Sequence, residues 1–227
     1  MKKEILEIKD FVLNISEKWI QTNRKGDTGV GKTFEDYLGV EENNSKGSDY
    51  KGIELKCFRK GKEKKSLQTL CTMEPQWVET NSRETILNNY GYISDDGKTR
   101  LNTSITNIEN NLGWSLKFEN GYLNILNYGV IVAKYDIKSI IKKFLITKLK
   151  DLVTIGTDVK KKNGKEYFNY NQMKYFTGIS GKNISKLISE GKLKIEFRMT
   201  SKKNYGTAFR INRKYLTELY ETCVEVV

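Results

Sequence analysis

Hydrophobic residues follow two different periods along the chain, which predicts a mixture of helices and strands. Apolar residues three and four positions apart, the spacing of one face of an α-helix, run from Ile5 to Trp19. The same reasoning predicts further helices over 32–39, 136–150, 184–190 and 213–223.

Short segments that are apolar or alternate with polar residues predict strands. The expected strands lie at 52–58, 66–72, 114–118, 122–128, 129–135, 151–156, 166–172, 193–199 and 206–212. Asn120–Gly121 is a strong signal for a hairpin turn between two of them. The stretch 74–110 is polar and irregular, and 158–165 has the composition of a loop. Because helices and strands alternate, we expect an α/β fold with a mixed central sheet flanked by helices.

The size and composition of the chain fit one large domain or two small lobes. Its 227 residues are 37% hydrophobic, which is enough for a core. No apolar run reaches the roughly 18–20 residues of a membrane span, and the charged N-terminal segment does not resemble a signal peptide. Three widely spaced cysteines without a CxxC pair predict reduced thiols and a cytoplasmic location.

The sequence contains no histidine, and this excludes several classes of hydrolase. Nucleases of the HNH and phospholipase-D types, Ser–His–Asp and Cys–His hydrolases, and histidine-ligated zinc sites all need this side chain. Any chemistry must therefore use Asp, Glu, Lys, Arg, Tyr or Ser.

Positive charge is concentrated late in the sequence. The net charge is +12, and residues 138–227 hold 20 basic and 8 acidic residues, which accounts for the whole excess. A strongly basic segment favours a polyanion such as nucleic acid as partner. Solubility alone is the simpler explanation, and the run Lys160–Lys162 by itself fits a solvated loop. The three tryptophans, Trp19, Trp77 and Trp114, are expected in the core.

Two motifs compete for the first sixty residues, and the first is a Walker A pattern, Gly26–Thr33. A P-loop requires a buried strand directly before it, so that backbone N–H groups cradle phosphate at the start of a helix. The preceding segment, SEKWIQTNRK, is charged and has helical spacing instead. An NTPase is therefore the weaker interpretation.

The second motif has the form D-x4-E-x-K and consists of Asp49, Glu54 and Lys56. Side chains two positions apart on a strand share a face, so Glu54 and Lys56 project together, and Asp49 can converge on them from the preceding turn. Two carboxylates can bind Mg²⁺, and the lysine can orient or help deprotonate a water molecule. The spacing alone also fits a solvent-facing strand, but Glu35 lies on the preceding helix and the basic segment could bind DNA.

Together these segments resemble the MvaI/BcnI group of type II restriction endonucleases, which is related to the MutH-like nicking endonucleases. The resemblance rests on RKGDTGVGKTFEDYLGVEENN, SDYKGIELK and NYGTAFRIN, in this order. It runs from about Lys18 to Leu219 and is densest at 24–56 and 191–212. It implies a PD-(D/E)XK nuclease fold with two lobes around a DNA cleft. We expect residues 1–135, with the motif at 35–56, to form mainly the catalytic lobe and 136–227 mainly the basic recognition lobe.

The resemblance also implies roles for single residues in catalysis. Asp49 and Glu54 would be metal ligands, Lys56 would activate water, and Glu35 would be an additional acidic residue of the active site. Ser48 replaces the proline of the family motif, a position that contributes shape rather than chemistry.

DNA contacts are implied for two further regions. The loop with Arg24, Lys25 and Thr28 would approach the DNA backbone or minor groove. Arg198 and Arg210 match positions on strands that face the major groove, where paired Arg–guanine contacts are common. The loop between these strands would also contact DNA, through Lys202, Lys203, Asn204 and Tyr205. Because histidines that read bases in the family are missing from 200–205, the target sequence does not follow from the resemblance.

The function that we expect from the sequence is Mg²⁺-dependent, sequence-specific cleavage of double-stranded DNA. The products would carry 5′-phosphate and 3′-hydroxyl ends, and a monomer would nick the two strands in succession. Mn²⁺ is expected to substitute for Mg²⁺, and Ca²⁺ to support binding without cleavage. A cognate DNA methyltransferase is the expected genetic partner, and no membrane is involved. Two alternatives stay open at this point: a MutH-like nicking or repair endonuclease, and a DNA-binding module without activity.

Overall fold

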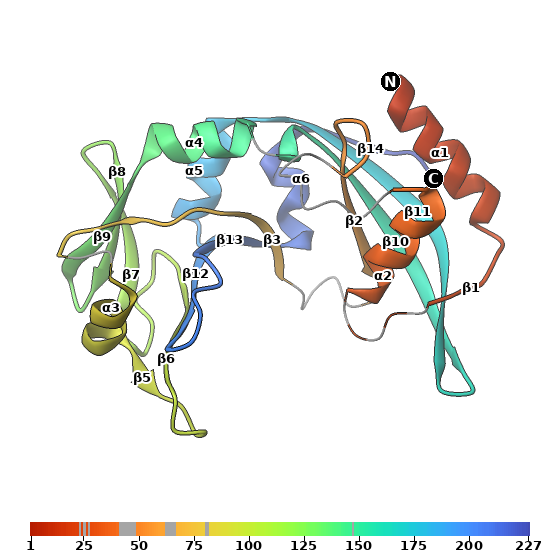
Figure 1. The fold of residues 1–227 in the computed structure, drawn as a ribbon. Helices are drawn as coiled ribbons and strands as arrows, with labels where there is room; N and C mark the ends of the chain where they lie inside the picture. Colours follow the sequence, from red (N-terminus) through yellow and green to blue (C-terminus); the bar gives the residue numbers. More distant parts are fainter. Residues whose placement is uncertain are drawn as a thin grey trace. The chain divides into compact units, whose positions relative to one another are not determined.

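The computed structural model describes residues 1–22, 24, 26, 28–40, 49–61, 67–79, 82–146 and 148–227. Contacts between Cα atoms divide the chain into two compact units (Figure 1). Unit 1 consists of residues 1–66, 145–179 and 220–227, and unit 2 consists of residues 67–144 and 180–219. The chain therefore passes four times from one unit to the other. No helix among the described residues is long and apolar enough to cross a membrane.

Unit 1 is built on a five-stranded mixed sheet. Its elements are α1 (Lys3–Ile15), β1 (Ile20–Gln21), α2 (Gly29–Leu38), β2 (Glu54–Arg59), the 3₁₀ helix η1 (Lys148–Lys150), β10 (Asp151–Lys162), β11 (Lys165–Ile179) and β14 (Tyr220–Glu225). The strands follow the order β1-β11-β10-β2, and β14 also pairs with β11. Among the described strands of unit 1, β2 and β10 are parallel and the other pairs are antiparallel.

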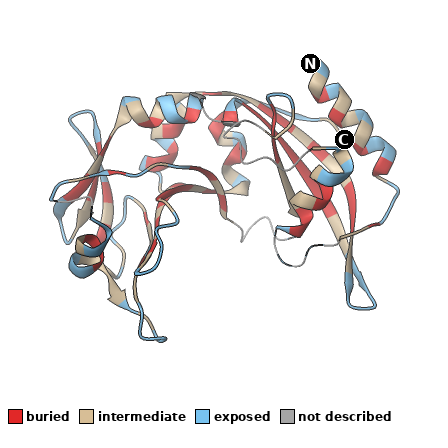
Figure 2. Cartoon of the chain, viewed as in Figure 1, coloured by how far each residue is buried: buried red, intermediate tan, exposed pale blue. Residues whose placement is uncertain are grey.

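The core of unit 1 lies between this sheet and helices α1 and α2. Ile5, Ile8, Val12 and Ile15 form the buried stripe of α1, as the helical spacing predicts, and Phe34 of α2 is fully buried. They pack with apolar residues of β2, β10 and β11, which appear as buried segments in Figure 2. The helix ends at Ile15, so the prediction that it reaches Trp19 is wrong, and the Trp19 side chain is 41% exposed rather than part of the core.

Strands β10 and β11 form a long antiparallel hairpin that continues through the segment expected to be a loop. The pairing runs without a break in the chain from Asp151↔Thr177 to Lys162↔Lys165, with a bulge at Gly156/Thr157. Asn163 and Gly164 make the turn, both with positive φ, which is the geometry of a two-residue hairpin turn. The interpretation of 158–165 as a loop is therefore wrong; only its two turn residues lack strand structure.

Unit 2 contains two sheets with helices around them. Its elements are β3 (Leu67–Thr72), β4 (Gln76–Trp77), α3 (Arg83–Tyr90), β5 (Tyr92–Ile93), β6 (Thr99–Ile105), β7 (Trp114–Glu119), β8 (Tyr122–Asn127), β9 (Val130–Asp136), α4 (Ile137–Ile146), α5 (Gly181–Ser189), β12 (Leu193–Thr200), β13 (Ala208–Asn212), η2 (Arg213–Tyr215) and α6 (Leu216–Leu219). The first sheet has the order β3-β13-β12-β6-β5 and the second β4-β9-β8-β7. Asn120 and Gly121 form the predicted turn between β7 and β8.

Aromatic contacts form the core of unit 2. Phe197 of β12 stacks on Trp77 at 5.2 Å between ring centroids and meets the edge of Trp114 at 5.1 Å. Trp114 is 1% exposed, which confirms its predicted place in the core. On β12 buried and half-buried residues alternate, so its remaining side chains form an open polar face on the first sheet.

In two stretches the structure differs from the sequence prediction. The stretch 74–110, expected to be irregular, holds α3 and strands β4 to β6. These elements are short and polar, so the periodicity is too weak to show them. The helix expected over 213–223 ends at Leu219, and β14 follows. The segment YETCVE pairs with β11 over Lys174–Ile179, and this tertiary pairing outweighs the helical spacing.

The units do not coincide with the two linear segments suggested by the charge. The boundary expected at 135/136 lies inside unit 2, because parallel pairing requires β10 to return to β2 by a long connection. Counted by unit, the sequence gives 22 basic and 17 acidic residues in unit 1, and 18 and 11 in unit 2. The basic excess is thus shared by both units, at +5 and +7.

Candidate active site

A tight turn brings the two acidic residues of the D-x4-E-x-K motif toward each other. Tyr50 and Ile53 exchange backbone hydrogen bonds of 3.0 and 2.8 Å. Lys51 and Gly52 between them both have positive φ, 44° and 91°, which is a two-residue hairpin turn. The chain reverses within four residues, so Asp49 lies beside the start of β2.

The carboxylate of Asp49 is fixed against β2 by a hydrogen bond. The backbone N–H of Leu55 donates to its Oδ2 at 3.0 Å. Glu54 begins β2 and is 5% exposed, and this strand lies parallel to β10 with Glu54 opposite Leu152. The pairing of β2 with β10 therefore fixes the backbone at both Glu54 and Lys56.

Lys56 connects the two carboxylates. Its Nζ donates a hydrogen bond to Oε1 of Glu54 and lies 3.9 Å from Oδ2 of Asp49. The carboxylates of Asp49 and Glu54 therefore both lie close to the same positive group, the ammonium of Lys56. The sequence spacing predicted this convergence, and the structure brings the three side chains together.

Glu35 contributes a fourth charge near this point. It lies on α2, which packs against β2. Burial raises the pKa of Glu35, the charge of Asp49 raises it further, and the nearby Lys32 and Lys56 lower it, with a net increase. The influence of Asp49 and Lys56 on this carboxyl places Glu35 within the electrostatic field of the motif.

Two residues beside the motif were not found from the sequence. The carboxylate of Glu7 on α1 accepts hydrogen bonds from the Tyr50 hydroxyl at 2.9 Å and from Lys51 Nζ at 2.7 Å. These bonds lower the pKa of Glu7. Glu7 thus holds the turn that separates Asp49 from Glu54. Its position, more than forty residues before the motif, gave no signal in the sequence.

The second residue is Tyr220, at the start of β14. It is 4% exposed, and its hydroxyl donates to the backbone oxygen of Leu149 at 3.0 Å. Burial raises the pKa of Tyr220, as do the charges of Glu54 and Asp151. This tyrosine is therefore a neutral neighbour of Glu54. Its segment was interpreted as a helix, which concealed the contact.

The predicted backbone-contacting loop is described in part. Arg24 and Thr28 are exposed, and Thr28 is the residue before α2 begins. Lys25 lies outside the described residues, as does Ser48. Arg24 and Lys32 are among the residues that line a cavity of about 180 Å³. The short strand β1 precedes this loop at the edge of the sheet rather than inside it, which agrees with the rejection of a P-loop.

Comparison with known families places this geometry in context. The model of the MvaI/BcnI restriction endonuclease family matches residues 8–220, which is nearly the whole chain. The chain belongs to the MvaI/BcnI restriction endonuclease family. It is therefore a site-specific deoxyribonuclease, and the resemblance noted in the sequence is confirmed.

Solved structures agree with the family assignment. The chain is similar to restriction endonuclease MvaI in complex with its cognate DNA substrate, with a TM-score of 0.82, 27% identity and complete coverage of both chains. It is also similar to MvaI in the absence of DNA, with a TM-score of 0.59, 27% identity and coverage of 100% and 99%. No curated protein matches the sequence. The similarity confirms the restriction-endonuclease-like α/β fold.

In this MvaI/BcnI family member the two predicted DNA-contacting arginines, both in unit 2, have partners within the protein. Arg198 donates to the backbone oxygens of Gly206 and Tyr205, at 3.1 and 2.9 Å. Arg210 forms an ion pair of 2.5 Å with Glu196 and donates to the oxygen of Leu67 at 3.0 Å. The ion pair between Arg210 and Glu196 is thus present in the protein without DNA.

The loop after β12 is exposed and internally bonded. Lys202, Lys203, Asn204 and Tyr205 are all exposed. The side chain of Asn204 accepts a hydrogen bond from the N–H of Gly206 at 2.8 Å, and Lys203 Nζ lies 5.0 Å from the centre of the Tyr205 ring. The structure therefore places these four residues on the surface of unit 2, next to Arg198.

A cavity of about 510 Å³ lies beside this loop within unit 2. Its lining includes Arg198 and Tyr205 together with polar residues that the sequence did not single out, namely Asn102, Thr103, Ser104 and Glu196. Ser104 of β6 donates a hydrogen bond to Glu196 of β12 at 3.3 Å. Pairing between these distant strands creates the cavity, which spacing along the chain cannot reveal.

The residues of the motif fit a divalent cation. The described residues contain no group of three or more Asp, Glu, His or Cys side chains that could hold a metal. Asp49 and Glu54, however, meet at the ammonium group of Lys56, and oxygen ligands of this kind suit Mg²⁺. Restriction endonucleases generally use divalent metal ions, and these two carboxylates have the right chemistry.

Proposed function

We propose that this restriction endonuclease hydrolyses phosphodiester bonds of double-stranded DNA at a specific sequence, with Mg²⁺ as its metal ion. The observation that carries the proposal is the meeting of Asp49, Glu54 and Lys56 at one point in a member of this family. The DNA complex of the similar MvaI structure supports a DNA duplex as substrate.

Each residue of the motif has a chemical role in the proposed reaction. Asp49 and Glu54 would hold the metal ion, which when bound stabilises negative charge on the scissile phosphate and lowers the pKa of a water molecule. Lys56 would orient that water, and its ammonium group donates a hydrogen bond to the Glu54 carboxylate. Glu35 adds a carboxyl whose raised pKa suits proton exchange with water. The proposed catalytic set thus consists of the two metal-binding carboxylates, Lys56 and Glu35.

We assign DNA contact to residues of both units. In unit 1 the loop with Arg24, Lys25 and Thr28 would meet the backbone or the minor groove. In unit 2 the bases would be read beside the cavity, by Arg198, Arg210, Lys202, Lys203, Asn204 and Tyr205. Because Arg210 is paired with Glu196, reading a base with this arginine requires exchange of one partner for another.

The finer features follow from the same proposal. One chain would cut the two strands in succession and leave 5′-phosphate and 3′-hydroxyl ends. Mn²⁺ would replace Mg²⁺, and Ca²⁺ would support binding alone. The enzyme would work in the cytoplasm together with a methyltransferase that protects the host DNA. A MutH-like enzyme that nicks one strand is the alternative, because the same three residues serve either reaction.

Digestion of an unmethylated plasmid library tests the proposal. The wild-type protein and Lys56→Ala are incubated with Mg²⁺, and the ends are identified by sequencing. We expect discrete ends from the wild type and a rate lower by about 10²–10⁴-fold in the variant, since the lysine supports proton transfer. Absence of cutting by the wild type with Mg²⁺ or Mn²⁺, despite DNA binding, would leave a binding module as the function.

A further inference from the structure

The hairpin of β10 and β11 extends past the sheet of unit 1. Pairing between β2 and β10 ends at Arg59↔Thr157, whereas β10 and β11 remain paired to Lys162↔Lys165. We call residues 158–167 the hairpin arm. At about 3.3 Å per residue, the five residues from 158 to 162 run roughly 16 Å past the end of β2, whereas on the other side β1 pairs with β11 as far as Tyr167. Figure 1 shows this tip standing clear of the rest of the sheet.

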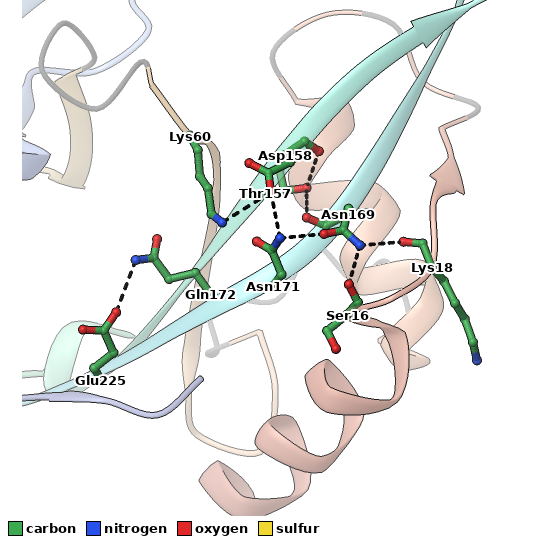
Figure 3. A network of polar contacts seen from close by, with 9 residues as sticks. All are labelled: Ser16, Lys18, Lys60, Thr157, Asp158, Asn169, Asn171, Gln172 and Glu225. Atoms are coloured by element: carbon green, nitrogen blue, oxygen red, sulfur yellow. Dashed lines mark hydrogen bonds and ion pairs between the residues drawn. The ribbon is translucent and has the colours of Figure 1, made fainter.

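The acidic residues of the hairpin arm are engaged at its base. Asp158 accepts hydrogen bonds from Asn171 at 2.7 Å and from Lys60 at 3.5 Å (Figure 3). Glu166 pairs with Arg59 at 3.1 Å. Both negative charges of the arm are thus neutralised by residues that lie outside it.

Three lysines at the tip point their charge to solvent. Lys161, Lys162 and Lys165 are exposed, and among the described residues no ion pair joins any of them to an acidic side chain. Glu166, which lies opposite Lys161 in the strand pairing, is engaged by Arg59. The three lysines flank the turn Asn163–Gly164, and Lys162 lies directly opposite Lys165 in the strand pairing. The arm therefore presents a compact group of uncompensated positive charges.

The base of the arm is braced by aromatic side chains. The ammonium group of Lys160 lies 4.1 Å from the centre of the Trp19 ring and 5.9 Å from that of Tyr167. The Tyr167 hydroxyl donates to Oε1 of Gln21 at 3.1 Å. Figure 3 also shows Asn169 of β11 donating to the backbone oxygens of Ser16 and Lys18. The arm is therefore held in place before any partner binds, which lowers the entropy lost on binding.

Direct contacts connect the arm to the loop that carries Arg24. The guanidinium of Arg59 donates both to Glu166 and to the backbone oxygen of Gly26, at 3.1 and 3.0 Å. The N–H of Thr22 donates to the oxygen of Glu166 at 3.0 Å. The arm and the described residues of the loop therefore lie together at one edge of unit 1, so a DNA backbone bound at Arg24 would pass close to the arm.

We propose that the hairpin arm binds phosphate groups of duplex DNA outside the recognised sequence, through Lys161, Lys162 and Lys165. The inference rests on the proposed function, in which DNA is the substrate. Lysine ammonium groups contact phosphate as point charges and do not distinguish bases. The arm therefore contributes affinity and length of bound DNA, while sequence discrimination stays with unit 2.

The test compares two triple variants of equal charge change. The first is Lys161→Ala/Lys162→Ala/Lys165→Ala. The control is Lys138→Ala/Lys142→Ala/Lys143→Ala on α4, which are also exposed. Helix α4 packs through Phe144 against Phe209, on the face of its sheet opposite Arg210, so the control lysines lie away from the proposed base-reading face. Thermal unfolding verifies that both variants are folded.

Binding is measured by fluorescence anisotropy in Ca²⁺ at several salt concentrations. One duplex is limited to the recognised sequence found by digestion, and the other has ten additional base pairs on each side. For the arm variant we expect a loss of about 10–100-fold on the long duplex and little change on the short one. The slope of log affinity against log salt should fall by about 2–3, since each phosphate contact contributes about 0.9.

The outcomes separate this inference from the proposed function. Phosphate binding by the arm is supported if the arm variant cuts the same sequence at the wild-type maximal rate but needs a higher concentration of the long duplex to reach half of that rate. Equal affinity and salt slope for the arm variant, the control and the wild type would show that the arm is only a solvated surface. If the wild type itself neither binds nor cuts DNA, both the function and the inference are wrong.

Discussion

At the scale of single residues, the distance between Asp49 and Glu54 depends on four residues of turn and on one side chain from another helix. Glu7 holds the turn through Tyr50 and Lys51, which occupy unspecified positions between the two acidic residues of the motif. Groups that orient metal ligands commonly matter almost as much as the ligands do. We therefore expect Glu7 to act as a positioning residue for the carboxylate pair.

Glu7→Gln should reduce DNA cutting by about 10-fold at low Mg²⁺ concentration, the typical effect of disturbing a group behind a metal ligand. The amide cannot form the ion pair with Lys51, so the turn is held less firmly. The measurement is the cutting rate as a function of Mg²⁺ concentration, with Asp10→Asn on the same helix as control. Rates that fall equally at every Mg²⁺ concentration, with a lowered melting temperature, would assign Glu7 a purely structural role.

At the scale of elements, the sequence predicted most helices and strands, including the strand that carries Glu54 and Lys56. It did so where one face of an element is buried, as in α1 and β12. It failed in the hairpin arm, because a paired strand that leaves the sheet has no buried face to produce a period. It failed also in β14, whose structure comes from pairing with β11 rather than from its own residues.

The candidate site shows the same division between local and distant information. The convergence of Asp49, Glu54 and Lys56 follows from a strand period of two, and it could be predicted. Glu7 and Tyr220 reach the site from the two ends of the chain. Nothing in their local pattern indicates this, because only the order of strands in the sheet brings them near.

The first residue of β10, Asp151, joins α1 to the sheet and should make stability depend on pH. It is 3% exposed and accepts hydrogen bonds from Lys2 and Tyr175, both at 2.5 Å. Burial by itself raises the pKa of Asp151, but the bonds from Lys2 and Tyr175 lower it overall. The ionised carboxylate is therefore favoured in the folded protein relative to the unfolded chain.

The pKa of Asp151 is lower in the folded protein than in the unfolded chain, where it is about 3.9. The stability contributed by the ionised carboxylate is therefore complete above about pH 3.9 and is lost as the pH falls through the folded-state pKa. Asp151→Asn should lower the free energy of unfolding by about 1–3 kcal/mol at pH 7. The difference from wild type should shrink below about pH 4. Urea unfolding at pH 7, 5 and 3.5 measures this, and a difference that stays constant with pH would exclude the charge as its cause.

At the scale of the whole molecule, both units carry an excess of positive charge, although the sequence order concentrates it in the last ninety residues. The reason is that unit 1 contains residues 145–179, with the lysines of the arm, in addition to the N-terminal segment. DNA binding therefore cannot be assigned to one unit from charge alone. The carboxylates of the motif belong to unit 1, and the cavity lined by Arg198 belongs to unit 2.

The number of active sites determines how a duplex can be cut. In the proposed function the D-x4-E-x-K set at 49–56 is the active site of the chain, and one such set would face one phosphodiester bond at a time. A monomer must therefore nick one strand, release or reposition the DNA, and cut the other.

A time course on supercoiled plasmid should show open-circular DNA that rises and then converts to linear DNA. When the enzyme concentration is below the plasmid concentration, the initial rate of cutting should increase linearly with the enzyme concentration. Linear product without a nicked intermediate, with a rate that grows as the square of enzyme concentration, would indicate a dimer, and persistent open-circular DNA would indicate a MutH-like nicking enzyme.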